Sequence, residues 1–257
     1  MNVVVCVKQV PDPNSTGQLD PATKNLRREG VELVLDPGDE FGIEAGLQLA
    51  EAHGGQVTVV SMGPEKALDA IRKALAMGAA KGVLISDDAL RGSDALSTAK
   101  VLAAAIKREG FDLVITATES TDGYTGTVPQ MVAELLGVPA VTFAKGLESD
   151  GKSLKVQRQT ETGYDRVEAT LPAVVSVTAS VNEPRYPSLK GIMAAKSKPV
   201  DRLTTAELGL DGVGGATAGQ TIVSVEPAEE RKAGEIIADD GEAAKRIVQF
   251  LEATKVI

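Results

Sequence analysis

The sequence predicts an α/β fold with a doubly wound, mainly parallel sheet, and three observations lead to this prediction. Apolar runs rich in β-branched residues at 2–7, 56–62 and 112–116 are typical of strands buried on both faces. Segments with helical periodicity separate these runs at a spacing that fits right-handed βαβ crossovers. Gly63 and Pro64 place a tight turn and a first-turn proline between one strand and its helix. The expected architecture is Rossmann-like.

The first expected element is the strand at residues 2–7, and a long loop follows it. Residues 8–30 are rich in Pro, Asp, Asn and Gly, and a loop of this length is either functional or a mobile surface loop. Residues 31–35 alternate like an edge strand. The turn at 36–39 then caps a helix that we expect over residues 40–52.

Strands and helices alternate regularly over the next part of the chain. The expected strands lie at 56–62, 82–86 and 112–116, and the expected helices at 65–77, 94–108 and 128–136. Small and hydroxylated residues fill the connection at 117–127. Ligands of open α/β sheets bind outside the carboxyl ends of strands, and free N–H groups at a helix start favour anions.

The sequence therefore predicts a nucleotide-sized crevice at the ends of the strands. It should form where Cys6 and Val7, the 36–39 turn, Met62 with Gly63, and the loop at 118–128 converge. The same segments could also be ordinary βα loops without a ligand. Cys6 is more typical of a small buried hydrophobic residue than of a reactive thiol. Asp122 could bind a ribose hydroxyl or only stabilise its own turn.

An antiparallel extension of the sheet is expected beyond the crevice loop. Strand-like runs occur at 140–143, 154–158 and 173–177, with turn signals at Asp150-Gly151 and Thr162-Gly163. The hairpin formed by 157–161 and 165–169 is heavily charged, which suits an exposed ribbon. A short capped helix is expected at 204–208.

The C-terminal part of the sequence predicts an arm without a core of its own. Residues 211–219 form a glycine-rich linker, 221–225 could add a strand, and 227–235 form a charged connector. Residues 241–254 predict a helix with one apolar face, formed by Ala244, Ile247, Val248 and Leu251. We expect a nucleotide-binding domain over residues 1–209 and an arm over residues 210–257 that lies on another protein.

The 182–198 segment does not resemble a core helix. Pro184 and Pro187 stiffen its start, and an apolar stripe at helical spacing follows, formed by Leu189, Ile192 and Met193. The lysines expected to surround this stripe are Lys190, Lys196 and Lys198. We interpret the segment as a short helix held out on a stiff stalk and offered to a partner protein, with an ordinary surface helix as the alternative.

Composition argues against several classes of function. A formal net charge of −9, from 36 acidic and 27 basic residues, disfavours diffuse nucleic-acid binding. One cysteine and one histidine disfavour a protein-bound transition metal and histidine-based catalysis. No apolar run approaches the ~18 residues of a membrane span and no secretory signal opens the chain, so we expect a cytoplasmic protein without membrane insertion. Known phosphate-loop and nucleophile motifs are missing, so we expect no active site.

The sequence closely resembles the β subunit of electron transfer flavoproteins. The most specific motifs are LPAVVSV at residues 171–177 and NEPRYPSLKGIM at residues 182–193. Further matching stretches lie at 7–12, at 36–37 with the helix that follows, and at 60–64, 75–79 and 121–130. Essentially the whole chain is therefore in register with that family.

The resemblance implies a heterodimer with a larger α subunit that holds most of a redox-active FAD, while this subunit buries a structural AMP. Primary dehydrogenases of the acyl-CoA type would pass electrons to the FAD, and this chain would carry no catalytic residues. Carried across by position, the implied AMP contacts are Cys6, Asp36, Pro37, Gly38, Asp39, Met62, Ala117, Thr118, Ser120, Asp122, Gly123, Thr125, Gly126, Thr127 and Val128.

The resemblance also implies two partner-binding regions. In the 182–198 segment the implied contacts are Tyr186, Pro187, Leu189, Ile192, Met193 and Lys196, with Leu189 as the anchor for the dehydrogenase. The arm from residue 210 would wrap onto the α subunit. Two alternatives stay open: an electron-bifurcating form with a second FAD in place of AMP, and a free-standing protein that binds an adenine nucleotide.

Overall fold

The computed structural model describes residues 1–15, 19–20, 22–226, 234, 236 and 238–257. These residues fall into two compact units, Met1–Val223 and Ser224–Ile257. The first unit extends beyond the expected domain end at residue 209, because Leu210 and Val213 pack against its core. Most of the charged connector expected at 227–235 lies outside the described residues.

The described part of the first unit is built on a sheet with the strand order β11-β5-β4-β1-β6-β10-β7-β8-β9. Strands from β11 to β7 are parallel, and β8 and β9 continue the sheet in antiparallel fashion. Their bounds are β1 (Asn2–Cys6), β4 (Gln56–Met62), β5 (Lys81–Ile85), β6 (Leu113–Ala117), β7 (Ala140–Ser149), β8 (Ser153–Thr160), β9 (Gly163–Thr170), β10 (Ala173–Val177) and β11 (Val200–Leu203). A separate antiparallel pair joins β2 (Gln9–Pro11) and β3 (Leu33–Leu35).

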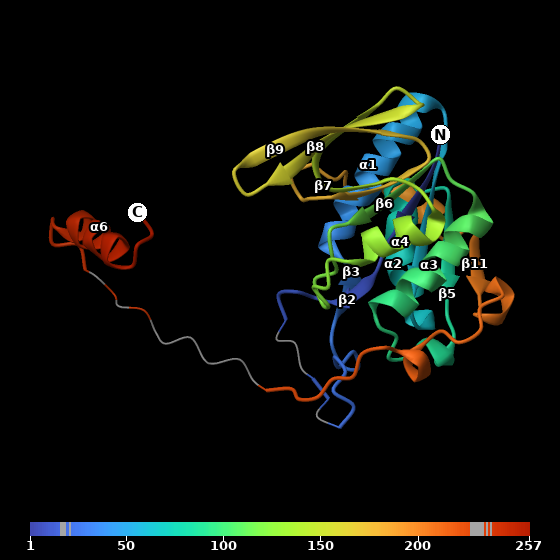
Figure 1. The fold of residues 1–257 in the computed structure, drawn as a ribbon, viewed down its shortest axis with the longest axis horizontal. Helices are drawn as coiled ribbons and strands as arrows, with labels where there is room; N and C mark the ends of the chain where they lie inside the picture. The colour runs from blue at the N-terminus through green and yellow to red at the C-terminus, as the bar shows by residue number, and fades with distance from the viewer. Residues whose placement is uncertain (16–18, 21, 227–233, 235, 237) are drawn as a thin grey trace. The chain divides into compact units, whose positions relative to one another are not determined.

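Helices cover both faces of this sheet, as Figure 1 shows. Side chains alternate between the faces of a strand, so Val3 and Val5 pack under α1 (Pro37–His53) and α2 (Leu68–Met77), whereas Val4 packs under α3 (Ala95–Glu109) and α4 (Val128–Leu136). The short helices are η1 (Glu65–Ala67), η2 (Asp88–Leu90), η3 (Ala206–Leu208) and η4 (Gly215–Thr217). The predicted doubly wound, mainly parallel α/β fold is confirmed.

Four details of the strand prediction are wrong, and the first is that β2 lies in the segment expected to be a loop. β10 lies parallel between β6 and β7, so only β8 and β9 form the antiparallel extension. The reason is that β10 is buried along its whole length, which places it inside the sheet. Residues 221–225 form no strand, and Lys24 Nζ donates to the carbonyls of Ile222 and Val223 at 2.8 and 2.7 Å. The edge strand β11 was not predicted.

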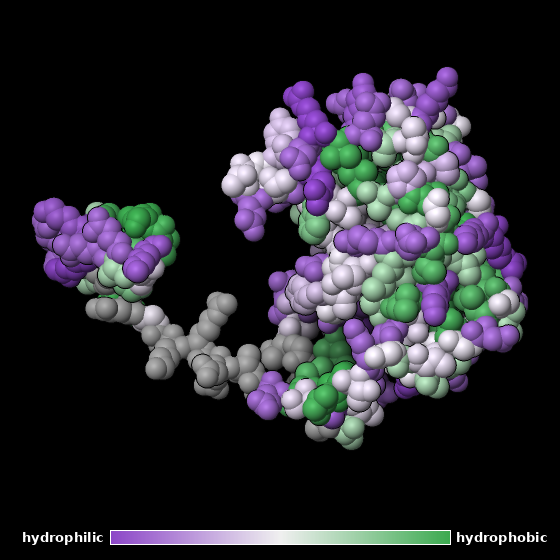
Figure 2. Space-filling model, in the orientation of Figure 1, coloured by the Kyte–Doolittle hydropathy of each residue, from purple (hydrophilic) through white to green (hydrophobic). Residues whose placement is uncertain are grey.

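The second unit contains α6 (Ala243–Ala253), which confirms the predicted terminal helix. Figure 2 shows hydrophobic side chains gathered on one side of this helix and hydrophilic ones on the other. Ile247, Val248 and Phe250 are 48%, 46% and 62% exposed. Within the described ranges of both units, no helix has the length and apolar character needed to span a membrane.

Gly46 allows α1 to lie close to β1. A Cβ at this position would lie 3.1 Å from Val5 Cγ2 and 3.3 Å from Val3 Cγ1. Gly46→Leu should lower the free energy of unfolding by about 1–3 kcal/mol, the usual cost of overpacking a core. Urea unfolding followed by circular dichroism measures this change.

The matched control is Gly163→Ala, because an added Cβ there meets no atom within 4 Å. This control should change the free energy of unfolding by less than about 0.5 kcal/mol. Identical unfolding curves for Gly46→Leu and the wild type would contradict the close packing of α1.

Candidate functional site

Three strand ends meet at the edge of the sheet where the sequence predicts the crevice. β1 lies between β4 and β6 in the sheet, so Cys6, Met62 and Ala117 end adjacent strands at the same edge. Cys6 and Met62 are half-buried, and Ala117 is buried. The structure therefore brings together the strand ends that the sequence predicted to converge.

Asp36 joins the 36–39 turn to the 117–128 loop. Its fully buried carboxylate caps α1, with Oδ1 accepting the Gly38 N–H at 2.9 Å. The other oxygen, Oδ2, accepts the Thr121 N–H at 2.7 Å and the Thr121 hydroxyl at 3.1 Å. Gly38 packs tightly beside it, because a Cβ there would lie 3.3 Å from Ala117 Cβ. The crevice loop is thus held to the start of α1.

Asp122 forms the centre of an ion cluster with two cations from the first loop. Lys8 Nζ lies 2.6 Å from Oδ1, and Arg28 Nη2 lies 2.5 Å from Oδ2. Burial acts to raise the pKa of Asp122, but Lys8 and Arg28 together hold that pKa below its usual value. Lys8 Nζ also donates to Ser120 Oγ at 3.2 Å. Asp122 therefore ties the 8–30 loop to the crevice loop, and its contact with a ribose stays a prediction.

The pKa of Asp39 is shifted upward, whereas that of Asp122 is shifted downward. It is buried in the first turn of α1, and its Oδ2 accepts the Lys8 N–H at 2.7 Å. Burial and the neighbouring Asp36 raise the pKa of Asp39 well above its usual value. Burial, with a smaller effect of Asp39, raises the pKa of the Cys6 thiol to about 12. Cys6 is therefore a protonated thiol at neutral pH, which fits the reading of it as a small packing group.

The crevice loop offers hydrogen-bond donors to an anion. Among the residues that the structure describes, no protein acceptor takes the backbone N–H of Thr125, Gly126 or Thr127, which lead into α4. Near the end of β6, the buried Thr116 hydroxyl has no partner within the described residues. Backbone N–H groups at a helix start favour a phosphate. The residues at this edge of the sheet therefore fit a ligand that carries a phosphate.

The remaining predicted residues follow the same loop. Thr118 and Ser120 are half-buried, Gly123 is exposed, and Val128 begins α4 behind Thr127. Three neighbouring residues were not predicted, namely Lys8, Arg28 and Thr116, and Thr121 was predicted only as part of the 118–128 loop. Lys8 directly follows the first buried strand and could have been included for that reason. Arg28 gave no local signal, because its partner Asp122 lies 94 residues away in sequence.

The 182–198 segment presents the predicted apolar stripe on the surface. Its helix α5 (Leu189–Ala195) begins at Ser188, whose hydroxyl accepts the Gly191 N–H at 3.0 Å. Leu189 and Met193 are 76% and 68% exposed. The other exposed apolar residues of the segment are Tyr186 and Ile192.

The expectation that the 182–198 segment is held away from the domain is wrong. α5 packs on α2, and Arg72 Nη1 donates to the carbonyls of Ala195 and Lys198 at 2.6 and 2.9 Å. Lys198 does not belong to the basic collar, because its ammonium donates to the carbonyls of Leu75 and Ala79. The carbonyls at the end of a helix need such donors. Lys190 and Lys196 are exposed as predicted.

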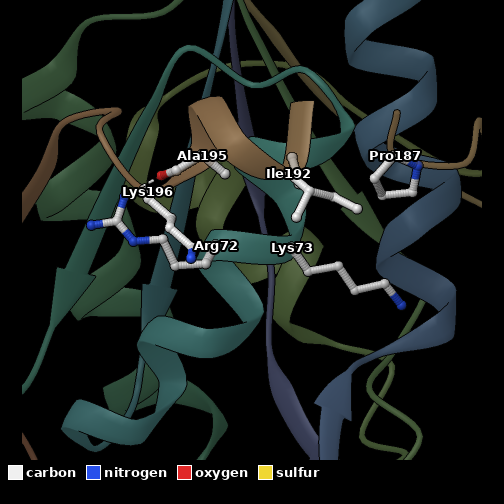
Figure 3. Close-up of a pocket in the computed structure, with 7 residues that line it drawn as sticks. Arg72, Lys73, Pro187, Ile192, Ala195 and Lys196 are labelled. Atoms are coloured by element: carbon white, nitrogen blue, oxygen red, sulfur yellow. Dashed lines mark hydrogen bonds between the residues drawn. The ribbon is translucent and has the colours of Figure 1, made fainter. Parts of the chain in front are cut away.

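A pocket of about 530 Å³ that opens to solvent lies beside the contact between α5 and α2. Figure 3 shows Arg72 and Lys73 on one side of it and Pro187, Ile192 and Lys196 on the other. Arg72 is held by the two carbonyls, and Lys73 pairs with Glu40. The underside of α5 therefore combines an apolar wall with a basic rim.

Known proteins similar to this chain are subunits of electron transfer flavoproteins. The family model of the electron transfer flavoprotein domain matches residues 23–208. The chain is 46% identical to electron transfer flavoprotein subunit beta of Mycobacterium tuberculosis, covering 100% of this chain and 99% of the relative. It is 38% identical to the subunit beta of Thermoanaerobacterium thermosaccharolyticum and 36% identical to that of Bacillus subtilis, with 100% of both chains covered in each case.

Asp39 leads to a prediction about pH. Its folded-state pKa lies above the unfolded value near ~3.9, so stability is lost as pH rises from that value through the folded pKa. Asp39→Asn keeps the oxygen that accepts the Lys8 N–H but removes the charge. The melting temperature of the variant minus that of the wild type should therefore increase from about pH 5 to about pH 8.

The control for this measurement is Asp211→Asn, at an exposed position. Its difference in melting temperature from the wild type should stay nearly constant across the same pH range. A difference for Asp39→Asn that shrinks as pH rises would show that the buried carboxylate does not destabilise the fold.

Proposed function

Because the chain belongs to the electron transfer flavoprotein β-subunit family, we propose that it works as the small subunit of a heterodimer. It pairs with an α subunit, binds AMP in the crevice, and docks acyl-CoA-type dehydrogenases through the 182–198 segment. FAD held mainly by the α subunit supplies the redox chemistry, accepting electrons from the dehydrogenase and passing them on. In this proposal the protein acts in the cytoplasm as an electron carrier.

The proposal assigns no catalytic residue to this chain. The single cysteine has a thiol whose pKa is raised to about 12, which makes it a poor nucleophile at neutral pH. The single histidine, His53, ends α1. The chain instead contributes positioning: it places a nucleotide and a docking surface on one sheet.

The observation that carries the AMP assignment is the donor group ahead of α4. The N–H groups of Thr125, Gly126 and Thr127 hold the phosphate, and Asp36 keeps their loop in place through Thr121. Cys6, Met62 and Ala117 provide the mostly apolar floor for the adenosine. A ligand that binds only the folded crevice stabilises the fold, which explains a structural role for AMP.

Docking rests on the exposed side chains of the 182–198 segment. Leu189, at 76% exposure, loses contact with water when it enters an apolar pocket on a dehydrogenase. Tyr186, Pro187, Ile192, Met193 and Lys196 surround it on the same segment. Lys190 and Lys196 favour an acidic partner surface.

Pairing with the α subunit rests on the C-terminal arm. The apolar side of α6 is exposed in the described part of its unit, where Ile247 and Val248 are 48% and 46% exposed. An exposed apolar helix face of this kind is typical of a protein interface. We propose that the α subunit binds this apolar face of α6.

Counting cofactors tests the nucleotide assignment. The purified heterodimer should release one FAD and one AMP per pair of subunits when it is denatured, as measured by liquid chromatography of the supernatant. Release of two flavins without AMP would instead support the electron-bifurcating alternative. A stable monomer of this chain alone with bound adenine nucleotide would support the free-standing alternative.

Leu189→Ala tests the docking assignment. Truncating an interface anchor costs about 2 kcal/mol or more, so the KM for the heterodimer in a dehydrogenase assay should rise by roughly 30-fold. FAD content and melting temperature should stay unchanged because the side chain lies in solvent. The matched control is Leu96→Ala, a half-exposed leucine in α3 on the opposite face of the sheet. Wild-type kinetics in Leu189→Ala would remove the anchoring assignment.

A further inference from the structure

We propose that Arg185 is a positioning residue that clamps the 182–198 segment to α1 and thereby sets the place of Leu189. This proposal rests on the docking function proposed above for the segment. It assigns Arg185, Glu44 and Glu51 a role in partner docking, although none of them belongs to the exposed apolar stripe.

The Arg185 guanidinium bridges two carboxylates on one helix. Nε and Nη2 donate to Glu44 Oε2 and Oε1 at 2.7 and 3.0 Å. Nη1 and Nη2 donate to Glu51 Oε1 and Oε2 at 2.6 and 3.1 Å. Two turns of α1 separate Glu44 from Glu51, so both carboxylates lie on one face. The backbone N–H of Arg185 adds a bond to Glu44 Oε2 at 3.2 Å.

Further hydrogen bonds and the burial of Glu44 fix the Arg185 clamp on α1. Glu44 is only 4% exposed, and Gln48 Nε2 donates to its Oε1 at 2.8 Å. Asn182, three residues before Arg185, donates through Nδ2 to the Phe41 carbonyl at 3.0 Å. Burial acts to raise the pKa of Glu44, but the bonds from Arg185 and Gln48 hold that pKa below its usual value. The ion cluster therefore stays charged at neutral pH.

The position of Leu189 follows from this clamp through a short and stiff connection. Only Tyr186, Pro187 and Ser188 lie between Arg185 and Leu189, and Pro187 has a fixed φ. Ser188 then caps α5, and Arg72 holds the far end of that helix on α2. The segment is thus fixed at both ends, with the exposed stripe between them.

A purely stabilising role accounts poorly for this arrangement. Burial of the Glu44 charge carries a desolvation cost, and ion pairs with exposed groups such as Glu51 stabilise a fold little. Such a pair does favour one geometry. An anchor held in its bound position avoids the cost of ordering the segment when the partner binds. We therefore assign the clamp to preorganisation of Leu189.

Two variants loosen the clamp in different ways. Glu51→Gln removes the more exposed carboxylate and leaves the pair of the half-buried Arg185 with the buried Glu44 intact. Arg185→Lys keeps the charge, but an ammonium does not bridge two carboxylates as a planar fork does. The charge-matched control is Glu65→Gln, which removes an exposed carboxylate that pairs with Arg202. Each variant is assayed as the purified heterodimer with an acyl-CoA dehydrogenase.

The KM for the heterodimer should rise by roughly tenfold in Arg185→Lys and by a smaller factor in Glu51→Gln, while kcat stays within about twofold. FAD and AMP contents and the melting temperature of Glu51→Gln should match those of the wild type. If Arg185→Lys does not fold, Glu51→Gln carries the test alone. An unchanged KM in the folded variants would overturn the positioning role.

A double-variant cycle separates this proposal from the docking proposal. In the Leu189→Ala background, Arg185→Lys should raise the KM by less than about twofold, because both changes act through the same anchor. Effects that multiply would overturn the positioning role. If Leu189→Ala itself leaves the KM unchanged, the docking function fails. If Leu189→Ala raises the KM and Arg185→Lys does not, only the positioning role fails.

Discussion

The carboxylate of Asp36 is the interaction on which the crevice depends. One oxygen caps α1 through Gly38, and the other holds Thr121 in the loop that leads to α4. Because this carboxylate is fully buried, losing either donor would leave one of its oxygens unpaired at the cost of desolvation. The start of α1 and the crevice loop therefore form one unit around this side chain. The N–H groups that we assign to a phosphate lie on the loop that Asp36 holds.

The helix α1 connects the two functional regions that we propose. Its first turn borders the predicted crevice, and Gly46 in its middle brings it close to β1. Glu44 in its middle and Glu51 near its end bind Arg185. A rigid helix packed on the sheet gives the nucleotide site and the docking segment a common base. In our proposal, this common base is the reason why a structural nucleotide supports a subunit whose task is docking.

The local environment gives Asp122 and Asp39 opposite pKa shifts, although both are aspartates near the same strand ends. Asp122 faces Lys8 and Arg28, which hold its pKa down against the effect of burial. Asp39 has Asp36 as a neighbour, and its pKa is raised by burial and by this negative charge. The sequence could place all three residues near one crevice from strand ends and turns. It could not assign their charges, because the deciding neighbours come from distant parts of the chain.

The sequence by itself determined the α/β class, the strand at 56–62, the helix at 128–136, the meeting of three strand ends at one edge of the sheet and the exposed apolar stripe of the 182–198 segment. Each of these depends on local periodicity, on turn residues or on a specific motif. Only the tertiary structure decided the parallel place of β10, the edge strand β11, the use of Lys198 on α2 and the bridge from Arg185 to α1. These features join residues far apart in sequence. Their physical basis is pairing between distant backbone and charged groups, and no local pattern records which partner each group will meet.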